Sequence, residues 1–379
     1  MNVFFSVGEP SGDLHGANLI RSLQARNPRI HATGFGGPKM AAAGAELLYP
    51  LTELAVMGVR RVVGHLPTFF RLAGQAERYF RTQKPDAVVL IDYPGFNFPV
   101  GKRAHAAGIP VYYFVPPQLW AWRSGRVRAV RKWCSSVLSA LPFEDEWYRK
   151  RGVPTHYVGH PYFDELAAQQ LNPAFLAEQR AKPGRVVALL PGSRTQEVVG
   201  NFAMMLATAG KVRAACPDVR FLVAAFSERH AVSIRAMMGA SDFPLEVHVG
   251  RTPEVIELAE ACVAVSGSVS LELMHRAKPT VIVYRMSPLS LWLARTLVKL
   301  RYFTLVNLLA GEELFPEFAT ARDESAGIAA HIAGWLNNPQ ERAALSARIA
   351  ALRDRVAVPG ACDRAAEFLL GSAAVRRAA

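Results

Sequence analysis

Short apolar segments alternate with helix-like segments along most of the chain. The apolar segments have strand length and fall at residues 3–7, 30–35, 87–91, 111–115, 186–190, 220–224, 245–249, 262–265 and 280–284. Apolar residues at helical spacing separate them, for example over residues 14–25 and 198–215. Strands that alternate with helices predict parallel sheets covered on both faces. We therefore predict the α/β class, with Rossmann-like doubly wound sheets.

A polar stretch rich in Ala and Gln interrupts this alternation between residues 159 and 184, and it contains Pro161, Pro173 and Pro183. At 379 residues the chain is also long for one domain. We therefore predict two domains that are joined in this stretch and face a cleft. Doubly wound sheets bind ligands at the carboxyl ends of their strands, so we expect the functional loops there.

Composition narrows the class of partner. The chain has 44 Lys and Arg against 31 Asp and Glu, a formal net charge of +13. This charge favours nucleic acid, an acidic membrane or phosphorylated substrates. The four Cys residues match no zinc or redox spacing, which predicts buried thiols in a reducing compartment. We find no signal peptide, and prolines interrupt the longest run without charges, residues 104–122, so we expect no plain transmembrane helix.

Residues 266–272, Ser-Gly-Ser-Val-Ser-Leu-Glu, follow a predicted buried strand and open a helix-like stretch that extends to Arg276. A glycine-containing turn at a helix start offers backbone N–H groups to a phosphate. Glu272, about one turn further on, is placed to accept hydrogen bonds from sugar hydroxyls. Phosphate and ribose side by side indicate a nucleotide, although an ordinary turn with a solvated Glu would have the same pattern.

Two polar loops follow predicted strands of the first half. Residues 8–13 read Gly-Glu-Pro-Ser-Gly-Asp and either orient a polar substrate or cap the next helix through Ser11 or Asp13. Asp92 ends the apolar strand at 87–91, where poor solvation raises a carboxyl pKa and suits a general base. The alternative is a carboxylate bound by the N–H groups of the Pro-Gly turn that follows.

Two further loops carry candidate binding groups. Arg194 follows the strand at 186–190, and its forked cation suits a diphosphate, although a solvent-exposed Arg would fit as well. Gln118, Trp120 and Trp122 follow the strand at 111–115, where the indoles either line a sugar pocket or pack in the core.

Several common catalytic motifs do not occur in the sequence. We find no GxxxxGK[ST] loop, HExxH helix or GxSxG elbow, and residues 34–37 (Gly-Phe-Gly-Gly) match only part of a dinucleotide fingerprint. We also find no Asp-x-Asp arrangement for a metal-bound diphosphate. We therefore expect no metal and no cofactor.

Ten short segments in fixed order together carry a family resemblance: residues 8–13, 55–58, 91–97, 120–123, 141–144, 158–161, 190–194, 266–268 with Glu272, 284–286 and 307–311. On these segments the chain resembles the lipid-A-disaccharide synthases, bacterial inverting glycosyltransferases of the GT-B fold. The resemblance covers residue 8 to about residue 318. With it we predict a first domain of residues 1–165, completed by C-terminal helices within 345–379, and a UDP-sugar-binding domain of residues 166–344.

The resemblance implies a reaction. UDP-2,3-diacylglucosamine would be the donor and 2,3-diacylglucosamine 1-phosphate the acceptor, giving a β-1,6-linked disaccharide 1-phosphate and UDP. Asp92 matches the family's proposed base. On the donor side we place Ser193, Arg194, Ser266, Gly267, Ser268, Glu272, Tyr284 and Asn307. On the acceptor side or in the cleft we place Glu9, Ser11, Gly12, Asp13, Asn97, Gln118, Trp120, Trp122 and His160.

Three positions depart from the family pattern: Gly95, where a second Asp is common, and Val306 and Thr320, where Pro and Gln are usual. The rival interpretation within the fold is a UDP-GlcNAc 2-epimerase or a peptidoglycan-type GlcNAc transferase. A nucleic-acid binder is the rival from another class, motivated by the basic run at 123–132. We do not favour it, because that run lacks interleaved aromatic residues.

Acylated substrates require contact with a bilayer, so we expect a cytoplasmic protein, peripheral on the inner face of the inner membrane, with a homodimer as one option. One candidate contact contains Val63, Leu66, Phe69 and Phe70 with flanking arginines. A second contains Leu289, Trp292, Leu293, Leu297 and Leu300 with Arg295, Lys299 and Arg301 beside them. An apolar stripe with a basic flank is typical of interfacial helices, and core packing is the alternative for both.

Overall fold

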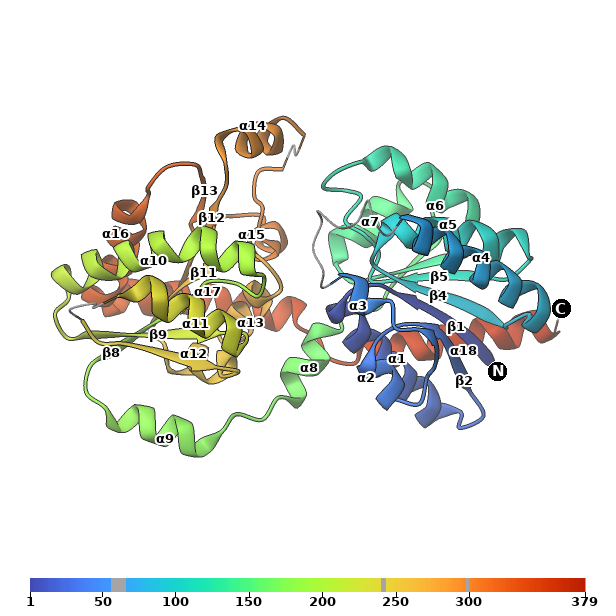
Figure 1. Ribbon diagram of the computed structural model, residues 1–379, viewed down its shortest axis with the longest axis horizontal. Coiled ribbons are helices and arrows are strands. Elements are labelled where there is room, and N and C mark those ends of the chain that lie inside the picture. Colours follow the sequence, from blue (N-terminus) through green and yellow to red (C-terminus); the bar gives the residue numbers. More distant parts are fainter. Residues whose placement is uncertain (56–65, 240–242, 298–299, 379) are drawn as a thin grey trace. The chain divides into compact units, whose positions relative to one another are not determined.

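The chain forms two compact units in a computed structural model that describes residues 1–55, 66–239, 243–297 and 300–378 (Figure 1). The first unit comprises Met1–Ala167 and Val358–Ala379, and the second comprises Ala168–Ala357. Both are α/β units with parallel sheets, as the alternating pattern predicts.

Within the described residues, the first unit has seven parallel strands in the order β3-β2-β1-β4-β5-β6-β7. The strands are Asn2–Val7 (β1), His31–Phe35 (β2), Glu46–Tyr49 (β3), Ala87–Ile91 (β4), Val111–Phe114 (β5), Ser136–Ser139 (β6) and Thr155–Tyr157 (β7). The helices are Pro10–Arg26 (α1), Pro38–Ala42 (α2), Thr52–Ala55 (α3), Leu66–Gln83 (α4), Pro94–Ala106 (α5), Val127–Trp133 (α6), Pro142–Arg149 (α7), Tyr162–Ala168 (α8) and Ala361–Ala378 (α18).

Alternate residues of these strands point into two separate cores. Phe4, Val88 and Leu90 pack against α4, α5 and α6 on one face of the sheet. Phe5 and Val89 pack against α1 and α18 on the other face (Figure 1). Both faces are therefore covered, which explains why the strands read as continuous apolar runs.

In the described part of the second unit, six parallel strands follow the order β10-β9-β8-β11-β12-β13. They are Arg185–Leu190 (β8), Val219–Ala225 (β9), Leu245–Val249 (β10), Ala261–Val265 (β11), Thr280–Arg285 (β12) and Glu317–Thr320 (β13). The helices are Pro173–Ala181 (α9), Thr195–Ala215 (α10), Glu228–Met238 (α11), Thr252–Leu258 (α12), Val269–His275 (α13), Pro288–Leu297 (α14), Leu305–Ala310 (α15), Ser325–Asn337 (α16) and Pro339–Val356 (α17). The main core lies under α10, α11 and α16.

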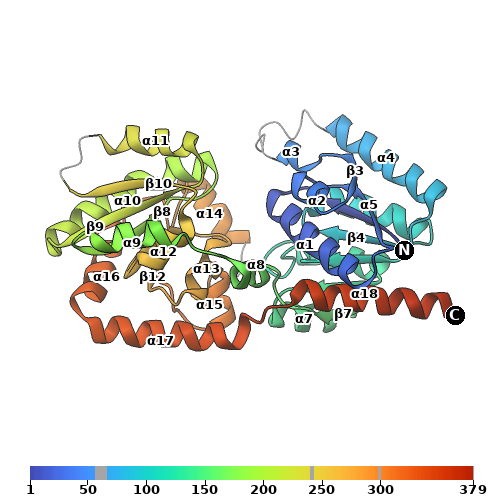
Figure 2. The same ribbon diagram turned by 90° about the horizontal axis from the view of Figure 1, so that it is seen from below.

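The division of the chain differs from the predicted one near its carboxyl end. Helix α17 packs against α13, α15 and α16, so residues up to Ala357 belong to the second unit (Figure 2). Only α18 returns to the first unit, where it packs on α1. Asp164 fixes the start of α18, because its carboxylate accepts hydrogen bonds from the N–H groups of residues 360, 361 and 362 at 2.6, 3.1 and 3.0 Å.

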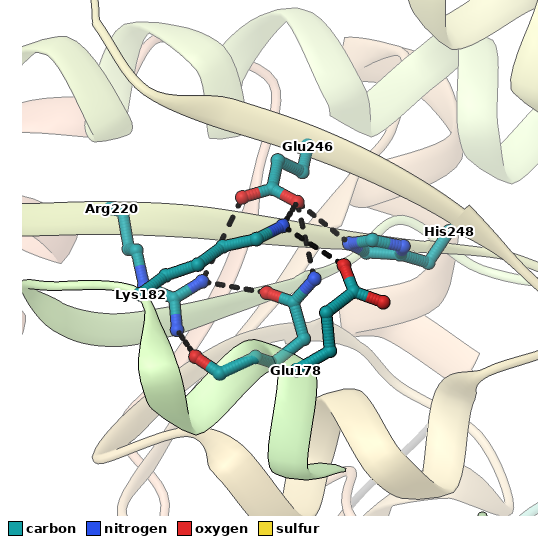
Figure 3. Close-up of polar contacts among 6 residues, drawn as sticks. Glu178, Lys182, Arg220, Glu246 and His248 are labelled. Carbon is teal, nitrogen blue, oxygen red and sulfur yellow. Dashed lines mark hydrogen bonds and ion pairs between the residues drawn. The ribbon is translucent and has the colours of Figure 1, made fainter. Parts of the chain in front are cut away.

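A buried polar cluster holds α9, the first helix wholly within the second unit, against the outer strands (Figure 3). Arg220 of β9 is 5% exposed and donates to the side-chain and backbone oxygens of Gln179 at 2.7 and 2.5 Å. Glu246 of β10 accepts from Lys182 at 2.8 Å and from Gln179 at 3.3 Å. His248 lies 3.5 Å from the same carboxylate. Polar contacts therefore replace apolar packing at this end of the sheet.

The four cysteines are free and buried, as predicted.

Candidate functional site

The turn after β4 is conformationally strained. Asp92 and Tyr93 adopt φ angles of 44° and 47°, the left-handed region that side chains other than glycine rarely occupy. Each such residue costs about 1–3 kcal/mol. Val115, whose carbonyl accepts the Asp92 N–H at 3.2 Å, is β-branched and also has a positive φ of 49°. The surrounding structure must therefore hold this turn in place.

Two buried side chains hold it. The Asn97 amide donates to the Asp92 carbonyl at 2.8 Å and to the Ile91 carbonyl at 3.0 Å, while its oxygen accepts from the Ser6 hydroxyl at 2.6 Å. The Tyr113 hydroxyl donates to the same Asp92 carbonyl at 2.7 Å. Asn97 is 0% exposed and positions the backbone of Asp92. Its place on the acceptor side or in the cleft stays a prediction.

Aromatic packing encloses the other side of the turn. A Cβ atom on Gly8 would lie 2.1 Å from the ring of Tyr93, so only glycine fits beneath this ring. Phe69 of α4 packs on Tyr93 and Phe96, with ring centroids 6.3 and 5.7 Å apart. The start of α4 is thus connected directly to the residue that follows Asp92.

The pKa of the Asp92 carboxyl group suits a general base. Burial and, to a smaller extent, the nearby Glu9 carboxylate raise the pKa of Asp92 to about 6, against a hydrogen bond from the Tyr93 backbone that lowers it. A carboxylate with this pKa is ionised at neutral pH but holds a proton better than an ordinary Asp. This is the property that a general base requires.

The first loop serves mainly to shape the fold. The Asp13 carboxylate accepts hydrogen bonds from the N–H groups of Gly37, Lys39 and Met40 at 2.9, 3.0 and 3.0 Å, which fixes the start of α2. The capping role of Asp13 therefore applies to α2 rather than to its own helix, and its place on the acceptor side or in the cleft stays a prediction. Gly12 is buried, and a Cβ there would lie 2.8 Å from Val7. Ser11 is exposed and Glu9 precedes α1.

The loop after β5 is anchored by α7. The Trp120 indole N–H donates to Glu144 at 3.1 Å, and the hydroxyl of fully buried Tyr148 donates to the Pro117 carbonyl at 3.2 Å. Burial raises the pKa of Glu144 to about 8, against the hydrogen bonds that it accepts. Trp120 is therefore partly buried and fixed, whereas Gln118 and Trp122 are exposed.

His160 lies beside the His15 ring, with centroids 5.9 Å apart. Its Nδ1 accepts a hydrogen bond from the Tyr162 N–H at 3.2 Å. Burial, with a smaller effect of His15, lowers the pKa of His160 to about 3, so this imidazole is neutral at physiological pH.

In the second unit, β8 and β11 are adjacent parallel strands, so the loops that follow them lie at the same edge of the sheet. The first loop carries Ser193 and Arg194, both exposed. The Arg194 guanidinium pairs with Glu197 at 2.7 Å. The second carries Ser266, Gly267 and Ser268, and α13 begins directly after it at Val269.

The remaining donor-side residues are more buried than expected. Glu272 is 3% exposed and lies 3.6 Å from Arg276 in the same helix. Asn307 is 0% exposed and donates to Phe315 and Glu317, while its oxygen accepts from the N–H groups of residues 314 and 315. An amide with both ends occupied holds the loop after α15, and donor binding by Asn307 stays a prediction. Tyr284 is half-buried at the end of β12.

Sequence reasoning missed two residues of this arrangement. Tyr113 lies inside an apolar strand, where its hydroxyl gives no separate signal. Glu144 belongs to one of the segments that carry the resemblance, but its burial depends on α7 packing under the loop after β5. Among the described residues, no group of three or more His, Cys, Asp or Glu side chains could hold a metal ion.

The candidate membrane residues differ in their exposure to solvent. Leu66 and Phe70 are 46% and 71% exposed, while Phe69 is partly buried against the core. Val63 lies outside the described residues. Pro67 lies in the first described turn of α4. No described helix is long and apolar enough to cross a bilayer.

Two Rossmann-like units with polar loops at the carboxyl ends of their strands are the architecture of the GT-B fold. The chain is similar in structure to UDP-GlcNAc 2-epimerase from Neisseria meningitidis bound to UDP-GlcNAc, with a TM-score of 0.68 and 13% identity over 98% of this chain and 100% of that one. It is also similar to MurG from Acinetobacter baumannii, with a TM-score of 0.60 and 13% identity over 98% and 99%. At this identity the likeness shows the fold alone.

Sequence comparison identifies the family. Residues 3–364 match the family described as Lipid-A-disaccharide synthetase. The chain is 38% identical to the lipid-A-disaccharide synthase of Alkalilimnicola ehrlichii, over 98% of this chain and 99% of that protein. The chain therefore belongs to the lipid-A-disaccharide synthase family and is a glycosyltransferase. The GT-B fold and the family resemblance predicted from the sequence are confirmed.

Proposed function

We propose that the protein transfers diacylglucosamine from UDP-2,3-diacylglucosamine to 2,3-diacylglucosamine 1-phosphate, which releases UDP and forms a β-1,6-linked lipid A disaccharide 1-phosphate. The Asp92 turn carries this proposal. A half-buried carboxylate with a raised pKa, held in a strained turn by Asn97 and Tyr113, is a preorganised base.

In this mechanism Asp92 takes the proton from the 6-hydroxyl of the acceptor. The hydroxyl oxygen then forms a bond to the anomeric carbon on the face opposite UDP, and the bond from this carbon to the diphosphate oxygen breaks. The negative charge that develops on the leaving diphosphate is stabilised by Arg194 and by backbone N–H groups in the 266–268 turn. Inversion at the anomeric carbon follows from this in-line displacement.

Incubation with the two acylated monosaccharides, followed by mass detection of disaccharide and UDP, tests the activity. We expect both products, in amounts unchanged by excess EDTA. Complete loss with EDTA would reveal a metal requirement. Epimerised UDP-GlcNAc or transfer to a peptidoglycan precursor, without disaccharide, would favour the rival enzymes of the same fold.

Acylated substrates lie in a bilayer, so we also propose that the exposed Leu66 and Phe70 at the start of α4 contact the inner face of the inner membrane. Leu66→Ser/Phe70→Ser should weaken binding of the protein to anionic vesicles with nearly unchanged thermal stability. Phe69→Ser is the contrasting variant, because it removes core packing and should lower the melting temperature. Unchanged vesicle binding by the first variant would contradict this contact.

A further inference from the structure

Helix α14 carries its large apolar side chains toward solvent. Leu289, Trp292 and Leu293 are 67%, 62% and 42% exposed. Their spacing of three and four residues places them on one side of the helix. Leu291 and Ala294 are only half-buried, and the helix packs against β13. Core packing within the second unit therefore does not explain this apolar side, and Figure 1 shows α14 at the margin of that unit.

The chain on either side of α14 carries basic residues. No Asp or Glu occurs between Glu272 and Glu312 in the sequence. Arg285 and Arg301, which precede and follow the helix, are exposed. Exposed apolar residues flanked by cations are typical of a surface that meets anionic lipid.

The size of the surface argues against a protein partner. Stable protein complexes bury roughly 800 Å² on each partner, and α14 has ten residues with three large exposed apolar side chains. A bilayer requires no complementary shape, so a small apolar surface is sufficient.

We propose that the apolar side of α14 inserts among the acyl chains of an anionic bilayer leaflet and gives the UDP-sugar domain its own membrane contact. This inference rests on the proposed function only in that acylated substrates bring the enzyme to a bilayer. The contact is separate from Leu66 and Phe70, which belong to the first unit.

The test is vesicle flotation of the full chain with phosphatidylcholine alone and with phosphatidylcholine plus phosphatidylglycerol. Leu289→Ser/Trp292→Ser should lower the partition coefficient on the anionic vesicles roughly tenfold or more. Val232→Ser/Val375→Ser, which changes residues that are 64% and 70% exposed elsewhere, is the matched control and should bind normally. The α14 substitutions should further weaken binding of the Leu66→Ser/Phe70→Ser variant.

Fluorescence provides a second measurement. Brominated phosphatidylglycerol should quench tryptophan emission of the native sequence, and Trp292→Phe should remove most of this quenching. Unchanged flotation, quenching that persists in Trp292→Phe, or equal loss on neutral vesicles would overturn the proposal. If the α14 substitutions disperse an oligomer but leave vesicle binding intact, this surface binds a second copy of the chain instead, and the proposal is overturned. Disaccharide synthesis from detergent-dispersed substrates is measured separately. Failure of the proposed function can therefore be distinguished from failure of the α14 membrane contact.

Discussion

The turn after β4 in the first unit and the turn after β8 in the second differ in how the protein holds their charged residues. Asp92 is largely removed from water, and its backbone is fixed by Asn97 and Tyr113. The Arg194 side chain is 74% exposed, and it pairs with Glu197 in the first turn of α10. One charge is positioned when the protein folds, whereas the other still has solvent around it.

This difference indicates at which step, folding or substrate binding, the cost of positioning each charged side chain arises. The strain and desolvation at Asp92 are offset by folding, so the base is ready before a substrate binds. At Arg194, the guanidinium must be ordered and lose its water when the donor binds, and both costs weaken donor binding. We therefore expect substitutions at the first turn to change turnover and substitutions at the second to change affinity.

The largest effect is expected at Asp92. Asp92→Asn keeps the shape of the side chain and removes the base, so turnover should fall about 10²-fold or more while UDP affinity stays unchanged. Asp86→Asn, at the opposite end of β4, is the control and should retain activity. Near-normal turnover of purified Asp92→Asn would exclude Asp92 as the base.

The next largest effect is expected at Arg194. Arg194→Ala should weaken UDP binding roughly tenfold to a hundredfold, because a hydrogen bond to a charged group contributes about 1.5–3 kcal/mol. Calorimetry with UDP measures this affinity. The control is Arg348→Ala, on α17, which removes an exposed ion pair with Glu312. Glu272→Ala should also weaken binding through the ribose. If both variants bind UDP normally, the nucleotide lies elsewhere.

A smaller effect is expected at Tyr113. Tyr113→Phe removes one hydrogen bond to the Asp92 carbonyl, about 1 kcal/mol, so kcat should fall roughly fivefold with little change in the donor KM. Tyr112→Phe alters the neighbouring residue of β5, whose side chain packs in the other core. Equal kcat values for the two variants would show that Tyr113 does not position the base.

The smallest effect concerns pH. Asp92 must lose its proton to act, so kcat/KM should rise with pH through a midpoint near 6. The Glu9 carboxylate raises this pKa, although less than burial does, so Glu9→Gln should move the midpoint to lower pH by a fraction of a unit. A midpoint that stays in place or moves to higher pH would contradict electrostatic coupling between the two carboxyl groups.

Most strands were predictable from the sequence, but the short or polar ones were not. Nine apolar runs predicted strands that the structure contains, and four were missed: β3, β6, β7 and β13. β6 reads Ser-Val-Leu-Ser and β7 has three residues, so neither forms a recognisable apolar run. Their position in the sheet depends on the pairing of β6 with β5 and of β7 with β6, which is a tertiary property.

Among the site residues, loop position was predictable but the direction of each side chain was not. Asp13, Asn97 and Asn307 lie in the first turns of α1, α5 and α15, and each side chain binds backbone groups outside its own helix. Composition cannot separate a polar residue that binds substrate from one that satisfies buried backbone N–H and C=O groups. The separation requires the tertiary fold.

Helix α18 has a consequence for the order in which the domains are completed during synthesis. The apolar side of α1, including Leu19, Ile20 and Leu23, belongs to the core that α18 covers. Residues 168–357 leave the ribosome before α18 does, so the second unit can finish folding first. The unit whose synthesis begins first therefore waits for the end of the chain. A fragment that stops at residue 167 would leave its α1 face open to aggregation.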